Sequence, residues 1–120
     1  METTLYDSKG HPVAYISSDH DNAIYLWKGH AVCYLVDDKV YGWRGKHIGW
    51  FIDGIVYDAR GSRVGFTQST CPYASYALPA KYAKYAQYAK YARYSANGQP
   101  ALSTGISKED LESFLEQDRV

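Results

Sequence analysis

The chain has 120 residues, with 13 lysines and arginines, 13 aspartates and glutamates, and 13 tyrosines. This even charge balance argues against a nucleic-acid-binding domain of the usual basic kind, and without an apolar run of eighteen residues no membrane span is expected. The length predicts one domain with appendages. With no signal peptide and no CxxC pair, we expect a cytoplasmic protein with reduced cysteines, the alternative being a disulfide between Cys33 and Cys71.

Four segments in the first seventy residues align without gaps. They are LYDSKGHPVAY (5–15), IYLWKGHAVCY (24–34), VYGWRGKHIGW (40–50) and VYDARGSRVGF (56–66). Each begins with an aliphatic residue and tyrosine, which favour a strand. Lysine or arginine and then glycine follow, and glycine supplies the positive φ of a tight turn. An aliphatic, a small and an aromatic residue complete a second strand, so each segment predicts a β-hairpin.

Residues 1–70 are therefore predicted to form a domain of eight short antiparallel strands. Four hairpins can bury their faces together around an axis, which also limits exposed strand edges. Strand alternation places the aliphatic and aromatic residues of each closing triplet on one face and the small residue on the other. The small position indicates a close approach of backbones or large rings. It is occupied by Ala14, Cys33, Gly49 and Gly65.

The shared pattern is Tyr-x-x-[KR]-Gly-x-x-[VI]-small-aromatic. With this pattern, above all in VYGWRGKHIGWFIDGIVYDARGSRVGFT, the chain resembles the four-fold beta flower domain of uncharacterised bacterial proteins over residues 4–68. The resemblance implies four hairpins around a pseudo-four-fold axis. It implies no activity, because that family has no established catalytic residues to carry over.

Residues 71–95 form a ribbon in which tyrosine recurs every third residue, with Pro79 at the one missing place. Polyproline II has three residues per turn, so it would place tyrosine, alanine and lysine on three separate edges, and we favour it. An α-helix from Pro79 to Tyr94 is an alternative, since alanine and lysine have high helix propensity. Disorder is a third.

The length of the ribbon has a consequence for assembly. A straight polyproline II segment of 22 residues would span roughly 68 Å, whereas a 65-residue domain is only about 25 to 30 Å across. The ribbon must therefore bend, project or contact neighbouring chains. This predicts a homo-oligomer formed through the ribbon.

The C-terminal part is predicted to be a linker over residues 96–106, rich in turn-forming residues, and a short helix over residues 107–118. Ser107 is the expected N-cap, and Asp110 its capping-box partner. A helix this short is marginal alone and should dock on another element. Its apolar stripe consists of Leu111, Phe114 and Leu115.

Two sets of residues are candidates for binding. A basic residue precedes the turn glycine in every repeat, and symmetric hairpins would assemble the four into a crown that could hold an anion. They are Lys9, Lys28, Arg44 and Arg60. The ribbon resembles a platform on which the bases of single-stranded nucleic acid stack. Its residues are Tyr82, Tyr85, Tyr88, Tyr91, Tyr94, Lys81, Lys84, Lys90 and Arg93. The plainer interpretations are solvated turns and structural packing.

Catalytic chemistry is not predicted, because the chain lacks a nucleophile elbow, a P-loop, a Rossmann fingerprint and a metalloprotease motif. His11 and His30 share one repeat position, but Lys46 and Ser62 take it in the other repeats, so we expect no metal and no cofactor. We predict a non-catalytic interaction or assembly module that binds itself or another protein through aromatic surfaces. The alternative is a binding protein for an anionic ligand or single-stranded nucleic acid.

Overall fold

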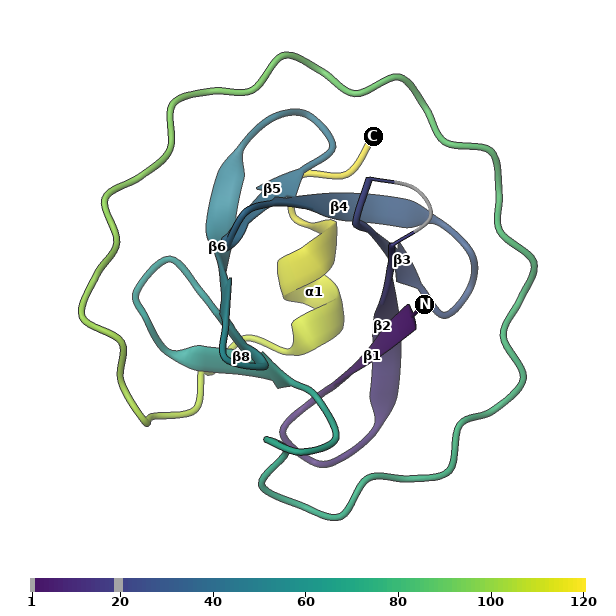
Figure 1. Ribbon diagram of the computed structural model, residues 1–120, viewed down its shortest axis with the longest axis vertical. Helices are drawn as coiled ribbons and strands as arrows, with labels where there is room; N and C mark the ends of the chain where they lie inside the picture. Colours follow the sequence, from purple (N-terminus) through teal and green to yellow (C-terminus); the bar gives the residue numbers. More distant parts are fainter. Residues whose placement is uncertain (1, 19–20) are drawn as a thin grey trace.

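The computed structural model describes residues 2–18 and 21–120, and in it eight antiparallel strands close into a barrel that is followed by one short helix (Figure 1). The mainly β fold with a C-terminal helix, predicted from the sequence, is confirmed. The elements are β1 (Glu2–Tyr6), β2 (Pro12–Ser17), β3 (Ala23–Leu26), β4 (Ala31–Val36), β5 (Lys39–Gly42), β6 (His47–Ile52), β7 (Ile55–Tyr57), β8 (Arg63–Phe66) and α1 (Leu111–Glu116).

The turns that join β1 to β2, β3 to β4, β5 to β6 and β7 to β8 have the same geometry. In each, the amide of a glycine donates to the carbonyl of the residue three positions earlier, at 2.8 to 3.1 Å. The glycines have φ between +85° and +104°, a conformation that residues with a side chain rarely adopt. They are Gly10, Gly29, Gly45 and Gly61. The role predicted for the turn glycine is therefore confirmed.

A carboxylate caps three of these turns. Asp7 in the first turn and Asp58 in the fourth each accept backbone hydrogen bonds from their own turn, at 2.9 to 3.0 Å. The third turn has Gly42 at this place, and its carboxylate comes instead from Asp118, which accepts from the amide of Lys46 at 2.9 Å. A Cβ on Gly42 would overlap the Asp118 side chain. The C-terminal segment is thus fixed to the barrel where a side chain is missing.

Helix α1 lies inside the ring of strands (Figure 1). Its three predicted apolar residues are at most 1% exposed and pack into the aliphatic core of the barrel, so the expected docking of the helix is confirmed. Burial of this stripe stabilises a helix that would not form alone. The barrel residues of this core are Leu5, Ala14, Ile16, Ile24, Leu26, Val32, Cys33, Val40, Ile48, Val56 and Val64.

The small position of the repeats faces this helix. A Cβ added to Gly49 would lie 2.7 Å from Cζ of Phe114, and one added to Gly65 would lie 2.8 Å from Cδ1 of Leu111. Real Cβ atoms do not approach other atoms so closely. The predicted close approach of a backbone or ring is therefore confirmed at Gly49, whereas at Gly65 the close neighbour is a leucine side chain; both glycines make room for the plug that α1 forms.

The predicted division of each closing triplet between the two strand faces is wrong. Val32 and Cys33 both belong to the inner core, whereas Tyr34 belongs to a separate aromatic cluster. The pairing of β3 with β4 shifts register between Ile24 and Tyr25, and the other three hairpins have equivalent shifts. A β-bulge adds one residue to a strand and breaks its alternation. The aliphatic residue and the small residue can therefore both face the core.

Helix α1 begins later than predicted. Its N-cap is Asp110, whose carboxylate accepts from the amide of Ser113 at 3.2 Å. Ser107, the predicted N-cap, instead donates its hydroxyl to Oδ2 of Asp58 at 2.7 Å. Asp58 is only 5% exposed, and a buried carboxylate needs hydrogen-bond donors. Ser107 is thus held at the fourth turn, and the helix starts only after the chain has crossed into the barrel.

The two cysteines are both free, so the disulfide alternative is wrong. Cys33 lies in the barrel core, where its thiol donates to the carbonyl of Leu115 at 3.0 Å. Burial raises the pKa of this thiol well above its ordinary value. Cys71 follows the last strand and packs against another cluster, which consists of Trp50, Ile55, Tyr57 and Phe66.

Replacement of the plug residue Phe114 by alanine should lower the free energy of unfolding by about 3–5 kcal/mol, because it leaves a cavity in the barrel core. Urea unfolding followed by tryptophan fluorescence measures this change. Leu102→Ala is the control, since Leu102 is 37% exposed and its loss should cost less than about 0.5 kcal/mol. Equal effects of the two substitutions would show that α1 does not complete the core.

Candidate functional site

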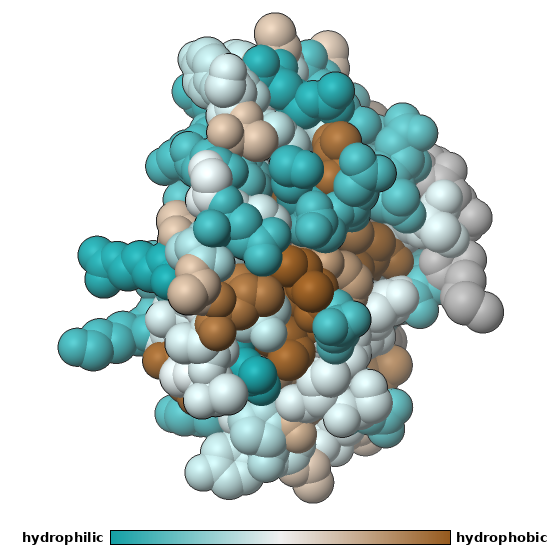
Figure 2. Space-filling view, turned by 60° about the vertical axis from the view of Figure 1, so that its left-hand side comes forward, coloured by the Kyte–Doolittle hydropathy of each residue, from teal (hydrophilic) through white to brown (hydrophobic). Residues whose placement is uncertain are grey.

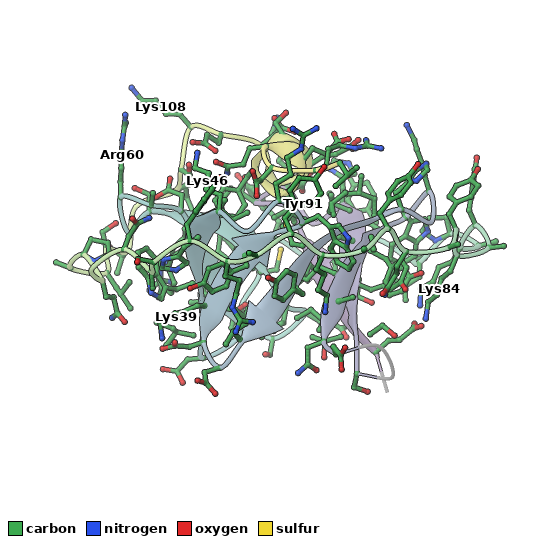
Figure 3. All side chains as sticks on the ribbon, turned by 90° about the horizontal axis from the view of Figure 1, so that it is seen from above. Lys39, Lys46, Arg60, Lys84, Tyr91 and Lys108 are labelled. Atoms are coloured by element: carbon green, nitrogen blue, oxygen red, sulfur yellow. The ribbon has the colours of Figure 1, made fainter. Side chains whose placement is uncertain are left out.

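Residues 73–103, which we call the belt, run around the outside of the barrel and contain neither helix nor strand (Figure 1). Seen from the side, the belt follows the middle of the barrel while α1 lies toward one end (Figure 3). The α-helical alternative for the ribbon is therefore wrong. The ribbon was expected to bend, to project or to contact neighbouring chains, and it bends around its own barrel. Its length alone thus gives no reason to expect a neighbouring chain.

The belt is anchored at every hairpin turn through the carbonyl of the turn glycine. The donors are backbone amides spaced nine residues apart, at distances of 2.9 to 3.0 Å. The pairs are Tyr76 with Gly10, Tyr85 with Gly29, Tyr94 with Gly45 and Ser103 with Gly61. An alanine carbonyl of the belt also occupies the space that a Cβ on each glycine would take. Nine residues of belt therefore span one hairpin of the barrel.

Two tryptophans add further anchors at the second and third hairpins. The indole Nε1 of Trp27 donates to the carbonyl of Pro79 at 3.3 Å, and that of Trp43 donates to the carbonyl of Tyr88 at 2.8 Å. The carbonyls of both tryptophans accept belt amides, at 3.3 and 3.1 Å respectively. These contacts repeat at the same nine-residue interval, so the middle of the belt is fixed along its length.

The tyrosine side chains of the belt are all more than half exposed. Their exposed fractions range from 51% for Tyr91 to 71% for Tyr94. His11 and His30, the two histidines at one repeat position, lie 4.4 and 4.2 Å from the rings of Tyr76 and Tyr85. These histidines therefore support belt tyrosines, which is a role that their spacing did not predict. The exposed rings are Tyr73, Tyr76, Tyr82, Tyr85, Tyr88, Tyr91 and Tyr94.

The belt cations contact the aromatic residues of the barrel. Lys84 Nζ lies 4.9 Å from the ring centre of Tyr25 and donates to the hydroxyl of Ser17 at 3.1 Å. The Arg93 guanidinium lies 5.6 Å from the ring centre of Tyr41. Lys81 and Lys90 make similar contacts. The cations of the predicted ribbon site thus contact barrel aromatics, whereas its tyrosine side chains stay more than half exposed.

The basic residues of the predicted crown are exposed on four separate hairpin loops. These loops lie at four different sides of the barrel, so the structure does not bring the four side chains to one point (Figure 1). Arg44 is engaged with the C-terminal segment, since its Nε donates to the carbonyl of Arg119 at 3.1 Å. Arg60 points away from the barrel on the side of α1 (Figure 3). The other two members are Lys9 and Lys28.

His47 anchors the belt after its last tyrosine, and sequence reasoning missed it. Its ring is 2% exposed, and Nδ1 accepts a hydrogen bond from the amide of Asn97 at 2.8 Å. Nε2 lies 2.9 Å from the carbonyl of Gly49, so the ring carries its proton there and donates it. Burial lowers the pKa of the imidazole. The other hairpins have no histidine at this place, so no repeat pattern could have marked it.

Hydrophobic surface is also exposed at the ends of two strands. The half-buried Leu35 and Val36 end β4, and Phe51 and Ile52 end β6. Figure 2 shows hydrophobic residues gathered in one area of the face it presents, with hydrophilic residues around them. Aromatic and aliphatic surface bordered by polar groups is typical of protein interfaces.

The surface of the barrel is grooved where its first and last strands meet. The groove where β1 meets β8, about 610 Å³ in volume, is lined by no histidine, cysteine or lysine. Within residues 2–18 and 21–120, no three or more histidine, cysteine or acidic side chains come together as a metal site would require. No helix in the same residues is long and apolar enough to cross a membrane.

A family model described as 4-fold beta flower protein matches residues 3–115. No curated protein and no solved structure matches the chain. The matched range extends past the predicted 4–68, through the belt and into α1. The family model therefore covers the hairpins, the belt and most of the plug.

The substitution Gly45→Ala should detach the belt locally and destabilise the fold. Gly45 has φ of +94°, and its new Cβ would overlap the carbonyl oxygen of Ala92. The backbone conformation alone costs about 1–2 kcal/mol. Thermal unfolding and proteolysis of the belt would measure the effect. Gly98→Ala, in the belt itself, is the control, because nothing lies within 4 Å of its added Cβ. Similar losses in both variants would contradict the anchoring.

The stability of the protein should fall as the pH drops below about 6.5, the ordinary pKa of histidine in an unfolded chain. Because the pKa of His47 is lowered in the folded state, the unfolded chain binds more protons in this range. The contribution is therefore complete above pH 6.5 and is lost as pH falls toward the folded pKa.

Unfolding free energies between about pH 7.5 and 5 would test this, with His47→Gln and His30→Gln compared with the unchanged chain. The His47 variant should lose much of the pH dependence, and the His30 variant should keep it. An unchanged slope in the His47 variant would assign the effect to other groups.

Proposed function

We propose that this chain, which belongs to the four-fold beta flower family, is a non-catalytic interaction module that binds protein through the exposed tyrosines of its belt. The single observation that carries the proposal is the ring of tyrosine side chains, each more than half exposed, on a segment whose backbone is hydrogen-bonded to every hairpin. Monomeric proteins seldom present so much aromatic surface unless it binds something.

Tyrosine suits this role physically. It offers a large apolar ring and a hydroxyl at a low cost in side-chain entropy, and it is enriched among the residues that dominate binding energy. A belt pinned by backbone hydrogen bonds loses little further freedom when a partner binds, which favours affinity. Regular anchoring also spaces the rings evenly.

The pseudo-four-fold arrangement of the hairpins adds an argument for self-association. The nine-residue belt units repeat the same chemistry at successive sides of the barrel, so one surface is offered several times. Repeated, self-similar surfaces favour symmetric assembly of identical chains. We therefore propose a second copy of the chain as the first partner to test.

The rival binding partner, single-stranded nucleic acid, is disfavoured by where the belt cations point. A nucleic-acid platform needs cations beside the stacking rings to follow the phosphates. Lys84 and Arg93 instead contact the barrel tyrosines. Of the basic turn residues, which are spread over four loops, Arg44 contacts a belt ring, at 5.9 Å from the ring centre of Tyr91. Because the belt uses its own cations on the barrel, its exposed rings fit a protein better than a polyanion.

An enzymatic role receives no support. The beta flower family is not a known enzyme family. The groove beside β1 offers threonine, serine and glutamine, and the carboxylate that lines it, Glu2, forms an ion pair with Lys81. The proposal therefore remains a binding function.

Substitution of Tyr82, Tyr88 and Tyr91 by serine should weaken self-association at least about tenfold, because each lost anchor of this kind typically costs more than 1 kcal/mol. Size-exclusion chromatography with light scattering over a concentration series measures the change. Serine at Ala80, Ala86 and Ala89 is the matched control on the same belt and should leave association unchanged. Circular dichroism checks that both variants fold.

A chain that stays monomeric at all concentrations would overturn self-association. Fluorescence titration with oligo(dT) tests the alternative. Tight binding at low salt that disappears at high salt would favour nucleic acid, since such binding releases counterions.

A further inference from the structure

Two lysines of the belt lie in aromatic boxes of nearly the same geometry. In the first box, Lys81 Nζ is 4.4 Å from the ring centre of Tyr15 and 5.3 Å from that of Trp27. The two rings meet edge to face, at 5.8 Å and 90°. An ammonium above two aromatic rings is stabilised by their quadrupoles. The box is therefore shaped around a cation rather than around an apolar side chain.

The second box repeats this arrangement nine residues along the belt. Lys90 Nζ is 4.4 Å from the ring centre of Tyr34 and 5.4 Å from that of Trp43. These rings meet at 5.7 Å and 88°. The same distances therefore recur on different strands, which indicates a built site rather than a chance contact.

Each box also has a carboxylate. Glu2 forms an ion pair with Lys81, and Asp21 lies 3.6 Å from Lys90 Nζ. Aromatic faces together with a carboxylate are the features with which proteins bind alkylammonium groups. The Lys81 and Lys90 side chains are only 30% and 29% exposed, so both cations are partly withdrawn from water.

The first and fourth hairpins have no tryptophan at the position of Trp27 and Trp43, where they carry Ser8 and Ala59. The paired strand residues Trp50 and Tyr57 contact groups of the barrel instead of the belt. His47 lies against Trp50, and Arg63 lies over the ring of Tyr57. The belt residue nine places after Lys90 is Gln99. The two boxes are therefore specific to the stretch of belt that carries lysine.

We propose that the two boxes are binding sites for alkylammonium groups, and that Lys81 and Lys90 are resident occupants which an external lysine or methylated lysine side chain can replace. The belt then competes with the external side chain for the two boxes. A partner segment with lysine beside small residues has the chemistry to take its place, because the belt itself enters the boxes in that form.

The inference goes beyond the proposed function, since it concerns the inner side of the belt and not its exposed tyrosines. Removal of one occupant should open one box while the glycine anchors still hold the belt. The substitution Lys90→Ala empties the second box, and Trp43 reports on it through the NMR signal of its indole N–H. Trp50, outside both boxes, is an internal reference.

Methylammonium is the probe, titrated into the full chain. In the Lys90→Ala variant it should shift the Trp43 indole signal saturably and leave Trp50 unchanged, whereas the unsubstituted chain, in which Lys90 competes, should need at least about tenfold more probe for the same Trp43 shift. The neutral probe tert-butanol should bind about tenfold more weakly than methylammonium, because it lacks the charge that the rings and Asp21 stabilise. Asp21→Asn added to the variant should weaken methylammonium binding.

The substitution Lys90→Met is a control for loosening of the belt, because the methionine side chain fills the box without a charge. It should fold and should not bind methylammonium. The matched substitution Lys81→Ala, read at Trp27, repeats the test in the first box. Equal responses of the substituted and unsubstituted chains, or equal binding of tert-butanol and methylammonium, would overturn the proposal.

Discussion

The rest of the structure depends on one contact, the docking of the belt on bare glycine turns. Each turn presents a carbonyl to a belt amide, and the missing Cβ leaves room for a belt carbonyl. The positive φ that closes each hairpin already requires glycine. One residue type therefore satisfies two demands, the tight turn and the docking groove. Because the turns recur around the barrel, the same contact can recur along the belt, and a segment without helix or strand acquires a fixed path.

The three-residue period of the belt follows from this docking. Tyrosine amides donate to the turns while their rings face solvent, alanine carbonyls fill the space above the glycines, and the lysines and arginine reach the barrel aromatics. Three triplets make the nine residues that connect one turn to the next. A helix could not do this, because its own hydrogen bonds would use the backbone groups that the turns require. The backbone of the belt therefore forms hydrogen bonds with the barrel instead of with itself.

Much of the fold could be predicted from local patterns, and the belt path could not. The repeats marked the hairpins, the turn glycines and the small positions, since each depends on residues close in sequence. The face of Val32 was mispredicted because a bulge alters alternation without a sequence mark of its own. The N-cap moved from Ser107 to Asp110 because Asp58, a distant residue, holds the serine. The path of the belt depends on a match between its nine-residue anchoring interval and the spacing of the turn glycines, which are 19, 16 and 16 residues apart, and neither spacing reveals the match alone.

The separation of charge from aromatic surface is what gives the belt its chemistry. A lysine beside an exposed tyrosine would attract polyanions, but the belt turns its lysines to the barrel and keeps its rings outside. There the cations stabilise the docked state, each by about 0.5–2 kcal/mol according to its desolvation. The positive charges of the belt therefore help to hold it on the barrel, and the cation that contacts the exposed Tyr91 ring, Arg44, comes from a hairpin turn. A segment that reads as cationic in the sequence thus uses its cations for packing inside the folded protein and leaves its tyrosine side chains more than half exposed.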